Sequence, residues 1–140
     1  MRKALLAVDG SDAAFRACLF LIDFIRQHGP VDVHVANVES KPLRCRSADA
    51  APETLDRREA ILAHVAMKPV LHALNEEGIA YQSHVKCGNV PQILVALAEQ
   101  LQCDTIIMGT RGLGGIPGMA VGSVARKVLH LSRLPVICVK

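Results

Sequence analysis

Apolar residues occur along the chain in two patterns, short continuous runs and longer stretches with helical spacing. Lys3 to Val8 is a continuous apolar run, as expected for a strand covered on both faces of a sheet. Four further apolar runs predict strands, at 31–38, 79–86, 105–108 and 136–139. Helical spacing between the runs predicts four helices, at 12–27, 53–77, 90–101 and 124–131.

This alternation of strands and helices predicts an α/β domain built on a five-stranded parallel sheet. Parallel strands are joined by right-handed crossovers, which place helices on both faces of the sheet. With 140 residues, the chain has the length of a single domain spanning 1–140.

Local residues refine these elements. Ser11 or Asp12 is expected to cap the first helix, and Asn89 the third. The apolar residues expected to mark the buried side of the first helix are Phe15, Leu19, Ile22, Phe24 and Ile25. Those expected for the second helix are Leu55, Ile61, Leu62, Val65, Leu71 and Leu74, with a kink at Pro69.

Polar residues alternate with apolar ones in the second and third strands. Asp32 and His34 alternate with valines, which predicts that one face of the second strand is less buried. The third strand alternates too and is expected at a sheet edge. His34 and His84 could be neighbours and suggest a metal, although polar positions on a partly exposed face are the favoured interpretation.

The most distinctive stretch runs from Thr105 to Val124 and reads TIIMGTRGLGGIPGMAVGSV. A short strand breaks into a glycine-rich loop and ends at Gly122-Ser123, where a helix begins. Glycine lets a ligand approach the main chain closely. The first amides of a helix lack partners within the helix and carry partial positive charge. The stretch therefore predicts a phosphate cradle.

Two familiar phosphate-binding motifs do not fit this loop. A P-loop requires lysine immediately before Ser123, and glycine stands there. A dinucleotide fingerprint starting at Gly112 would require glycine where Pro117 stands. The spacing that fits is Gly109-x2-Gly112-x9-Gly122-Ser123, which resembles the nucleotide-binding signature of the universal stress protein family, G-x2-G-x9-G-S/T.

The resemblance extends over the whole chain. It includes an opening Val8-Asp9-Gly10-Ser11, a Gly88-x2-Pro91 before the third helix and a closing LPVICV at 134–139. It implies strand order 3-2-1-4-5 and a small cytoplasmic stress-response protein that binds ATP and usually dimerises. In that order the first and fourth strands flank the switch point of the sheet, so Asp9 and the glycine loop would face one crevice.

The resemblance also implies roles for individual residues. Asp9 would contact the ribose or a Mg²⁺ ion on the phosphates, and the main chain of Val38 would contact the adenine edge. Phosphates would bind the backbone amides and the Ser123 hydroxyl at the start of the last helix. The predicted binding residues are Val8, Asp9, Val38, Met108, Gly109, Arg111, Gly112, Gly122, Ser123 and Val124.

Residues 113–121 contain no basic side chain, although family members often carry one there. AMP or ADP could therefore occupy the site in place of ATP. An alternative is an interaction protein that binds no nucleotide and works through protein partners. A third hypothesis is an enzyme of the adenine-nucleotide α-hydrolase-like group, but Val8 to Asp12 is too short and acidic for its pyrophosphate loop. No motif positions a general base, so no catalytic residue is predicted and any ATP hydrolysis would be slow.

The final strand, Val136-Ile137-Cys138-Val139, is apolar and is expected at a sheet edge. Exposed apolar edges are a liability unless covered. Pairing of this strand with its copy in a second chain would cover it, and the family commonly dimerises in this way. The alternative is coverage by the C-terminal residues alone.

The composition of the chain bears on three further questions: nucleic acid binding, membrane insertion and the state of the cysteines. A formal charge of +3, no Trp and one Tyr do not favour nucleic acid binding, and no apolar run is long enough to span a bilayer. Five cysteines are scattered without Cys-x-x-Cys pairs, which indicates reduced, mostly buried thiols. Cys45, between Arg44 and Arg46, could be a redox sensor or part of a solvated loop at 39–52.

Overall fold

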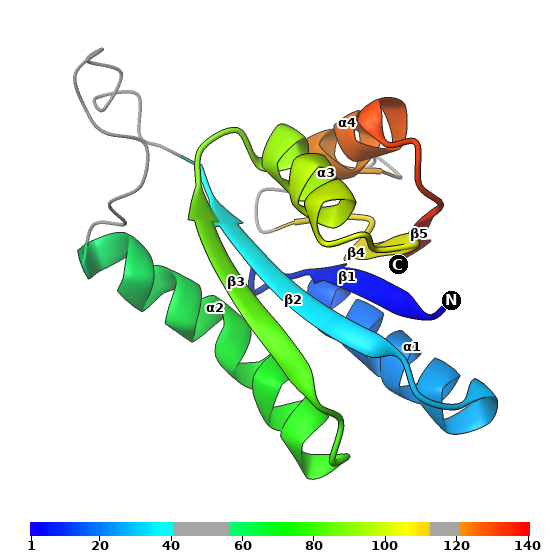
Figure 1. Cartoon of the computed structure of the whole chain (residues 1–140). Coiled ribbons are helices and arrows are strands. Elements are labelled where there is room, and N and C mark those ends of the chain that lie inside the picture. Colours follow the sequence, from blue (N-terminus) through cyan, green and yellow to red (C-terminus); the bar gives the residue numbers. More distant parts are fainter. Residues whose placement is uncertain (41–56, 113–120) are drawn as a thin grey trace, which may run out of the picture.

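The computed structural model describes residues 1–40, 57–112 and 121–140. Its five strands are β1 (Lys3–Ala7), β2 (Asp32–Glu39), β3 (Tyr81–Cys87), β4 (Thr105–Gly109) and β5 (Val136–Val139). Its four helices are α1 (Asp12–His28), α2 (Arg57–Glu76), α3 (Val90–Gln100) and α4 (Ser123–Leu131). Strands and helices alternate along the chain, as the hydrophobic pattern predicts (Figure 1).

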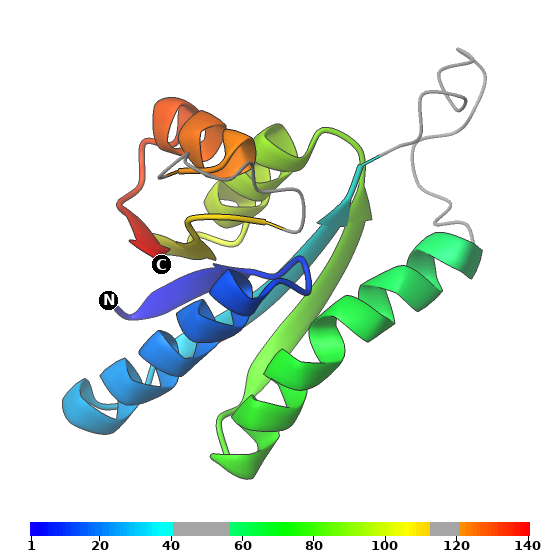
Figure 2. The same cartoon turned by 180° about the vertical axis from the view of Figure 1, so that it is seen from behind.

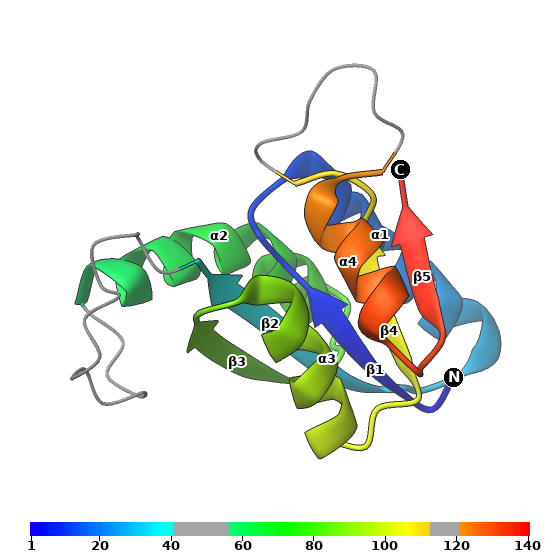
Figure 3. The same ribbon diagram turned by 90° about the horizontal axis from the view of Figure 1, so that it is seen from above.

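The strands form one parallel sheet in the order β3-β2-β1-β4-β5. Helices α1 and α2 cover one face, and α3 and α4 cover the other (Figures 1 and 2). The predicted fold and strand order are therefore confirmed. β1 and β4 are neighbours in the sheet, although a long stretch of chain separates them (Figure 3). The order in which the chain adds strands to the sheet therefore reverses between β1 and β4.

The central strands are buried on both faces, which explains their continuous apolar runs. In β1, Leu6 packs with Ile107 on the side of α1 and α2. Leu5 packs with Ile106 on the side of α3 and α4. Two apolar layers thus hold the sheet between the helix pairs.

Two predicted helix caps are confirmed. The Ser11 hydroxyl accepts a hydrogen bond from the amide of Ala14 at 3.2 Å. The Asn89 side chain accepts one from the amide of Gln92 at 3.3 Å. Gly29 follows the last turn of α1 with φ of 97°, a conformation that glycine adopts without strain. These residues determine where α1 and α3 begin and where α1 ends.

The predicted buried faces of α1 and α2 are partly wrong. In α2, Ile61, Leu62 and Val65 are 57%, 49% and 63% exposed. The residues of α2 that are buried are Ala63, Met67, Val70 and Leu74. Similarly, Leu19 of α1 is exposed, and the buried residues are Ala13, Ala14, Ala17, Cys18, Leu21 and Ile22.

The physical reason is that both helices have two apolar sides. The side that is buried carries small residues, such as Ala63 in α2 and Ala17 in α1, beside larger ones such as Met67 and Leu74. Ile61, Leu62 and Val65 of α2 and Leu19 of α1 lie on the other side and remain exposed. Leu55 lies outside the described residues, and α2 continues through Pro69 to Glu76.

The prediction of a less buried face on β2 is also wrong. His34 is 2% exposed, because β2 lies inside the sheet and the imidazole packs against β3. Nδ1 of His34 lies 2.9 Å from Nε2 of His84, within hydrogen-bonding distance. The predicted neighbourhood of the two histidines is thus correct, and β3 is an edge strand as expected.

Among the described cysteines, Cys18 and Cys103 are buried as expected, whereas Cys87 and Cys138 are partly exposed. Burial raises the pKa of Cys18 and of Cys103 to about 11, so both remain protonated at neutral pH. Cys45 and the predicted loop at 39–52 fall largely outside the described residues. In the part of the chain that is described, no helix has the length and apolar character needed to cross a membrane.

Candidate functional site

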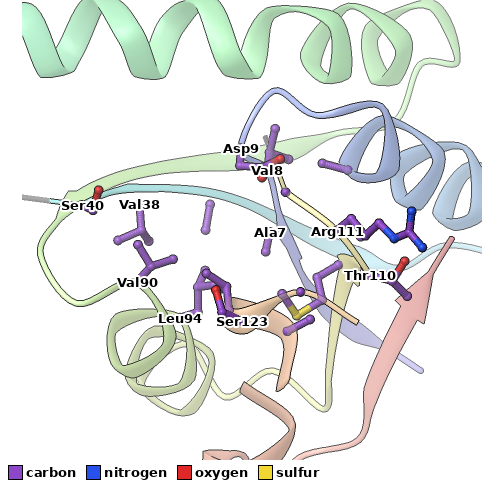
Figure 4. A pocket seen from close by; sticks show the side chains of 18 of the residues that line it. Ala7, Val8, Asp9, Val38, Ser40, Val90, Leu94, Thr110, Arg111 and Ser123 are labelled. Atoms are coloured by element: carbon purple, nitrogen blue, oxygen red, sulfur yellow. The ribbon is translucent and has the colours of Figure 1, made fainter. Parts of the chain in front are cut away.

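A cavity of about 500 Å³ lies beyond the carboxyl ends of β1, β2 and β4. The first turns of α3 and α4 line its other side. The position is the switch point between β1 and β4, where open α/β sheets bind their ligands. We call this cavity the crevice (Figure 4).

All ten residues predicted to bind a ligand line the crevice: Val8, Asp9, Val38, Met108, Gly109, Arg111, Gly112, Gly122, Ser123 and Val124. They come from four separate parts of the sequence. The described lining residues that were not predicted are Ala7, Ala14, Ala36, Glu39, Ser40, Val90, Leu94, Thr110, Ala125 and Arg126.

One end of the crevice, the apolar end, is formed by side chains. Val38, Val90 and Leu94 project into it from β2 and α3 (Figure 4). Ala7 and Ala36 line the same region from β1 and β2, and their small side chains leave space above the sheet. A flat apolar group fits this end best.

The other end, the cradle end, is formed mostly by main chain. Thr110 and Arg111 lie here, at the opposite side of the view from Val38 and Val90 (Figure 4). A Cβ atom added to Gly112 would come within 2.5 Å of Oδ2 of Asp9. One added to Gly122 would come within 3.2 Å of the Thr110 carbonyl oxygen. A side chain at Gly112 would therefore push on the Asp9 carboxylate, and one at Gly122 would crowd the Thr110 carbonyl.

The start of α4 contributes helix-terminal N–H donors to the cradle end. The amide of Gly122 donates to the Thr110 carbonyl at 2.6 Å, which holds the helix start against the loop. Gly122 occupies the cap position of α4 and has no side chain with which to satisfy the next amides. Those amides and the exposed hydroxyl of Ser123 are available to an anion.

The Asp9 carboxylate is held in place between the two ends. Its Oδ1 accepts hydrogen bonds from the Ser11 amide at 2.9 Å and from the Ser11 hydroxyl at 2.6 Å. The side-chain amide of Asn37, which is buried, donates to the Val8 carbonyl at 2.9 Å. Asn37 thereby fixes the turn that follows β1. These contacts leave Oδ2 of Asp9 facing Gly112.

The charges around the crevice have both signs. Arg111 and Arg126 supply positive charge, and Asp9 and Glu39 supply negative charge. Within residues 1–40, 57–112 and 121–140, no three His, Cys, Asp or Glu side chains come close enough together to hold a metal ion. The site that these residues form suits a ligand with an apolar ring at one end and an anionic group at the other.

Some of the lining residues that were not predicted had a sequence signal. Val90 and Leu94 follow Gly88 and are one helical turn apart, so α3 presents both to the same space. Thr110 lies between two glycines of the predicted motif. Ala7 and Ala36 had no such signal, because only the pairing of β1 with β2 brings them together.

The family model and the similar known sequences all belong to one protein family. The model of the Universal stress protein family matches residues 1–140. The chain is 26% identical over 139 residues to a universal stress protein of Methanocaldococcus jannaschii, covering 99% of this chain and 82% of that one. It is 29% identical over 142 residues to a universal stress protein of Thermus aquaticus, covering 99% of this chain and 98% of that one.

Comparison with solved structures agrees with these matches. A universal stress protein of Archaeoglobus fulgidus is similar, with a TM-score of 0.73, 26% identity and coverage of 100% of this chain and 98% of that one. The structure of the universal stress protein from Archaeoglobus fulgidus in complex with dAMP has a TM-score of 0.69 and 29% identity. It covers 100% of this chain and 98% of that one.

Proposed function

This chain belongs to the universal stress protein family, and from that membership and the crevice we propose that it binds adenine nucleotides. One observation carries the proposal. Ten residues chosen from spaced sequence motifs line a single cavity that has an apolar end and a cradle end. Its volume of about 500 Å³ falls within the usual range of small-molecule sites, roughly 300–1,000 Å³.

The chemistry of each region suggests which part of the nucleotide it holds. The adenine ring is planar and largely apolar, so it suits the apolar end beside Val38, Val90 and Leu94. The ribose hydroxyls suit Asp9, whose Oδ2 remains available as an acceptor. The phosphate suits the free amides at the start of α4 and the Ser123 hydroxyl. A solved relative in complex with dAMP supports this assignment.

In this proposal the protein is a nucleotide-dependent regulator in the cytoplasm that acts in stress responses. ATP, ADP and AMP all contain the recognised base, ribose and first phosphate. With ATP, Asp9 is the residue at hand for a Mg²⁺ ion carried by the phosphates. Nucleotide binding rather than turnover is proposed as the signal.

A second candidate function is partner binding without a nucleotide. One observation favours it: Ile61, Leu62 and Val65 form an exposed apolar stripe on α2. This stripe is separate from the crevice, so the two functions could be tested independently. Loss of partner binding on Val65→Asp, without loss of nucleotide binding, would favour this candidate.

We also propose that the protein is a homodimer paired along β5. Val136, Ile137, Cys138 and Val139 are all half-buried at the edge of the sheet. Leu129 and Leu131 of the adjacent α4 are 47% and 44% exposed, which adds apolar surface beside this edge. Pairing of two β5 strands would cover both features. Sedimentation of wild-type protein and Ile137→Lys tests this, with a monomeric variant expected.

The nucleotide proposal is tested by thermal unfolding with and without AMP or Mg-ATP. A ligand at 100 times its dissociation constant stabilises by about 2.7 kcal/mol, which raises the unfolding temperature by several degrees. The shift should disappear in Gly122→Val, because the valine side chain would occupy the cradle end. Ser83→Ala, on the exposed edge of β3, is a control that should keep the shift. Wild-type protein that is free of bound nucleotide and shows no shift would contradict the proposal.

A further inference from the structure

The charge of the chain is divided unevenly along the sequence. Residues 105–140 contain five of the 16 Lys and Arg residues and none of the 13 Asp and Glu residues. Residues 1–104 hold the other eleven basic residues and all 13 acidic ones, so their formal charge is −2. The net positive charge of the chain therefore comes entirely from the part that contains β4, α4 and β5.

Three of these five cations lie on α4 or directly after it, beside β5 (Figure 3). Val128 of α4 is buried in the apolar layer that covers the sheet, whereas Arg126 and Lys127 are exposed. His130 is exposed too and lies one helical turn after Arg126, so both project from the same side of α4. Arg133 is exposed just beyond the end of the helix. We give the name cationic surface to these exposed residues, Arg126, Lys127, His130 and Arg133.

The two arginines and the lysine of the cationic surface lack acidic partners among the described residues. Elsewhere in the molecule such pairs do form, and Nζ of Lys3 lies 3.2 Å from a carboxylate oxygen of Asp32. By contrast, no ion pair within residues 1–40, 57–112 and 121–140 involves a side chain of the cationic surface. Their charges are therefore available to an anionic group from outside the chain.

The helix itself adds to this positive charge. The first turn of α4 contains no acidic residue, and Arg126 and Lys127 follow directly after it. The start of a helix carries partial positive charge, which cations reinforce rather than offset. The field along α4 therefore has one sign, and it attracts anions.

Most of the cationic surface is separate from the crevice. Arg126 lines the crevice, but Lys127, His130 and Arg133 are not among its described lining residues. A nucleotide bound in the crevice would thus leave the greater part of this surface uncovered. The surface needs a second, larger partner that reaches along the outside of α4.

A short acidic protein segment fits this surface better than nucleic acid or a membrane. α4 has nine residues, so the surface extends over only about 14 Å. Residues 105–140 contain no Phe, Trp or Tyr to stack on bases or to sit at a membrane interface. The negative formal charge of residues 1–104 would also repel a long polyanion that extends past α4.

We propose that the cationic surface docks an acidic segment of a partner protein. Side-chain carboxylates of that segment pair with Lys127 and Arg133, and with Arg126 at the edge of the crevice. This inference goes beyond nucleotide binding and does not depend on it. It also differs from partner binding at the apolar stripe of α2, which lies on the opposite face of the sheet (Figures 1 and 2).

Fluorescence anisotropy of a labelled peptide of eight glutamates tests this inference with three proteins. They are the wild type, Lys127→Glu/Arg133→Glu, and the control Lys68→Glu/Arg57→Glu, which makes the same charge change at exposed positions of α2. Reversal of two charges should weaken peptide binding at least about tenfold. The control should bind within about twofold of the wild type. Binding to the wild type should weaken between about 50 mM and about 300 mM salt, because the contacts are exposed.

Several outcomes would overturn the inference. One is a wild type that does not bind the peptide at concentrations up to about 1 mM. Another is an equal loss in both double variants, since net charge rather than the cationic surface would then explain binding. Tighter binding of a short DNA duplex or of anionic-lipid vesicles than of the peptide would replace the acidic segment with another class of partner.

Two further measurements keep these outcomes distinct. Lys127→Gln/Arg133→Gln removes the charges without reversing them, so it should bind the peptide more weakly than the wild type even if the reversal variant folds poorly. Peptide binding by this variant equal to that of the wild type would overturn the inference. AMP binding by the wild type is a separate readout, and its absence would contradict the proposed nucleotide function alone.

Discussion

The two ends of the crevice are built in opposite ways. At the apolar end, the side chains of Val38, Val90 and Leu94 define the space. At the cradle end, the space exists because Gly112 and Gly122 have no side chains. In the proposed complex, the ligand is contacted by side-chain surface at one end and by main-chain donors at the other.

This difference determines how each end can be disrupted. Binding at the apolar end should be lost when an existing side chain becomes larger, because the added atoms would fill the place proposed for the base. The cradle end is damaged when any side chain appears, because it meets backbone or Asp9 at close range. Enlarging a side chain at the apolar end should therefore mainly affect binding. Adding a Cβ atom at a glycine of the cradle end should also affect folding, because the atom would meet backbone or Asp9.

The largest effect is expected for Gly109→Ala, at the junction of β4 with the cradle. An added Cβ atom would lie 2.7 Å from the carbonyl carbon of Ala13 and 2.8 Å from the Ala14 amide nitrogen. Backbone atoms of α1 would have to move, and such overpacking costs roughly 1–3 kcal/mol. Urea unfolding should show a midpoint well below that of the wild type, and an unchanged midpoint would contradict the close packing of α1 on β4.

The next largest effect is expected for Val90→Trp at the apolar end. The indole would fill the space assigned to the base, and losing burial of such a ring weakens binding by roughly 10–100-fold. Val65→Trp is the matched control, because Val65 is 63% exposed on α2 and away from the crevice. Calorimetry with AMP should show weak binding for the first variant and normal binding for the control. Equal AMP affinity of the two variants would contradict the placement of the base at the apolar end.

A smaller effect is expected for Gly112→Ala at the cradle end. Its Cβ atom would displace the Asp9 carboxylate, which Ser11 holds in place. Loss of a hydrogen bond to a charged group should weaken AMP binding by about tenfold. If the variant acts through Asp9, adding Asp9→Asn should weaken binding little further. Additive losses in the double variant would mean that Gly112 acts by another route.

The smallest effect is expected from pH and concerns the strands that support the apolar end. Burial, followed by the charges of His34 and Lys86, lowers the pKa of His84 below its ordinary value of 6.5. Near pH 6.5 the unfolded chain then binds more protons than the folded protein. The free energy of unfolding therefore falls as the pH is lowered from above 6.5 toward the pKa of His84 in the folded protein. The unfolding temperature should drop between about pH 7.5 and about pH 5.5. His84→Gln should reduce that drop, and an equal drop in both proteins would exclude His84 as its source.

Much of the fold was predictable because the apolar runs are short and continuous. The central strands β1 and β4 are covered on both faces, so burial and sequence pattern agree there. The side of α2 that packs inward was not predictable from spacing alone. Ile61 and Val65 are more apolar than Ala63, but the small residue allows the close approach and is buried. His34 was misjudged because its burial depends on His84, a partner distant in sequence.

The residues of the crevice also divide into those that the sequence could predict and those that it could not. Residues in spaced motifs, such as Asp9 and Gly122, were predictable because glycine and turn residues report backbone requirements directly. Ala36 was not, since only strand pairing brings it to the crevice.

In the proposed complex, one adenine nucleotide occupies both ends of the crevice at once. An amide chemical-shift titration of isotopically labelled protein with AMP tests this directly, because it reports on the two ends separately. We expect shifts at Val38 and Val90 together with shifts at Gly112, Gly122 and Ser123, while Val65 on α2 stays unchanged. Saturating AMP that moves no crevice amide, or moves only those on α2, would show that the nucleotide does not bind in the crevice.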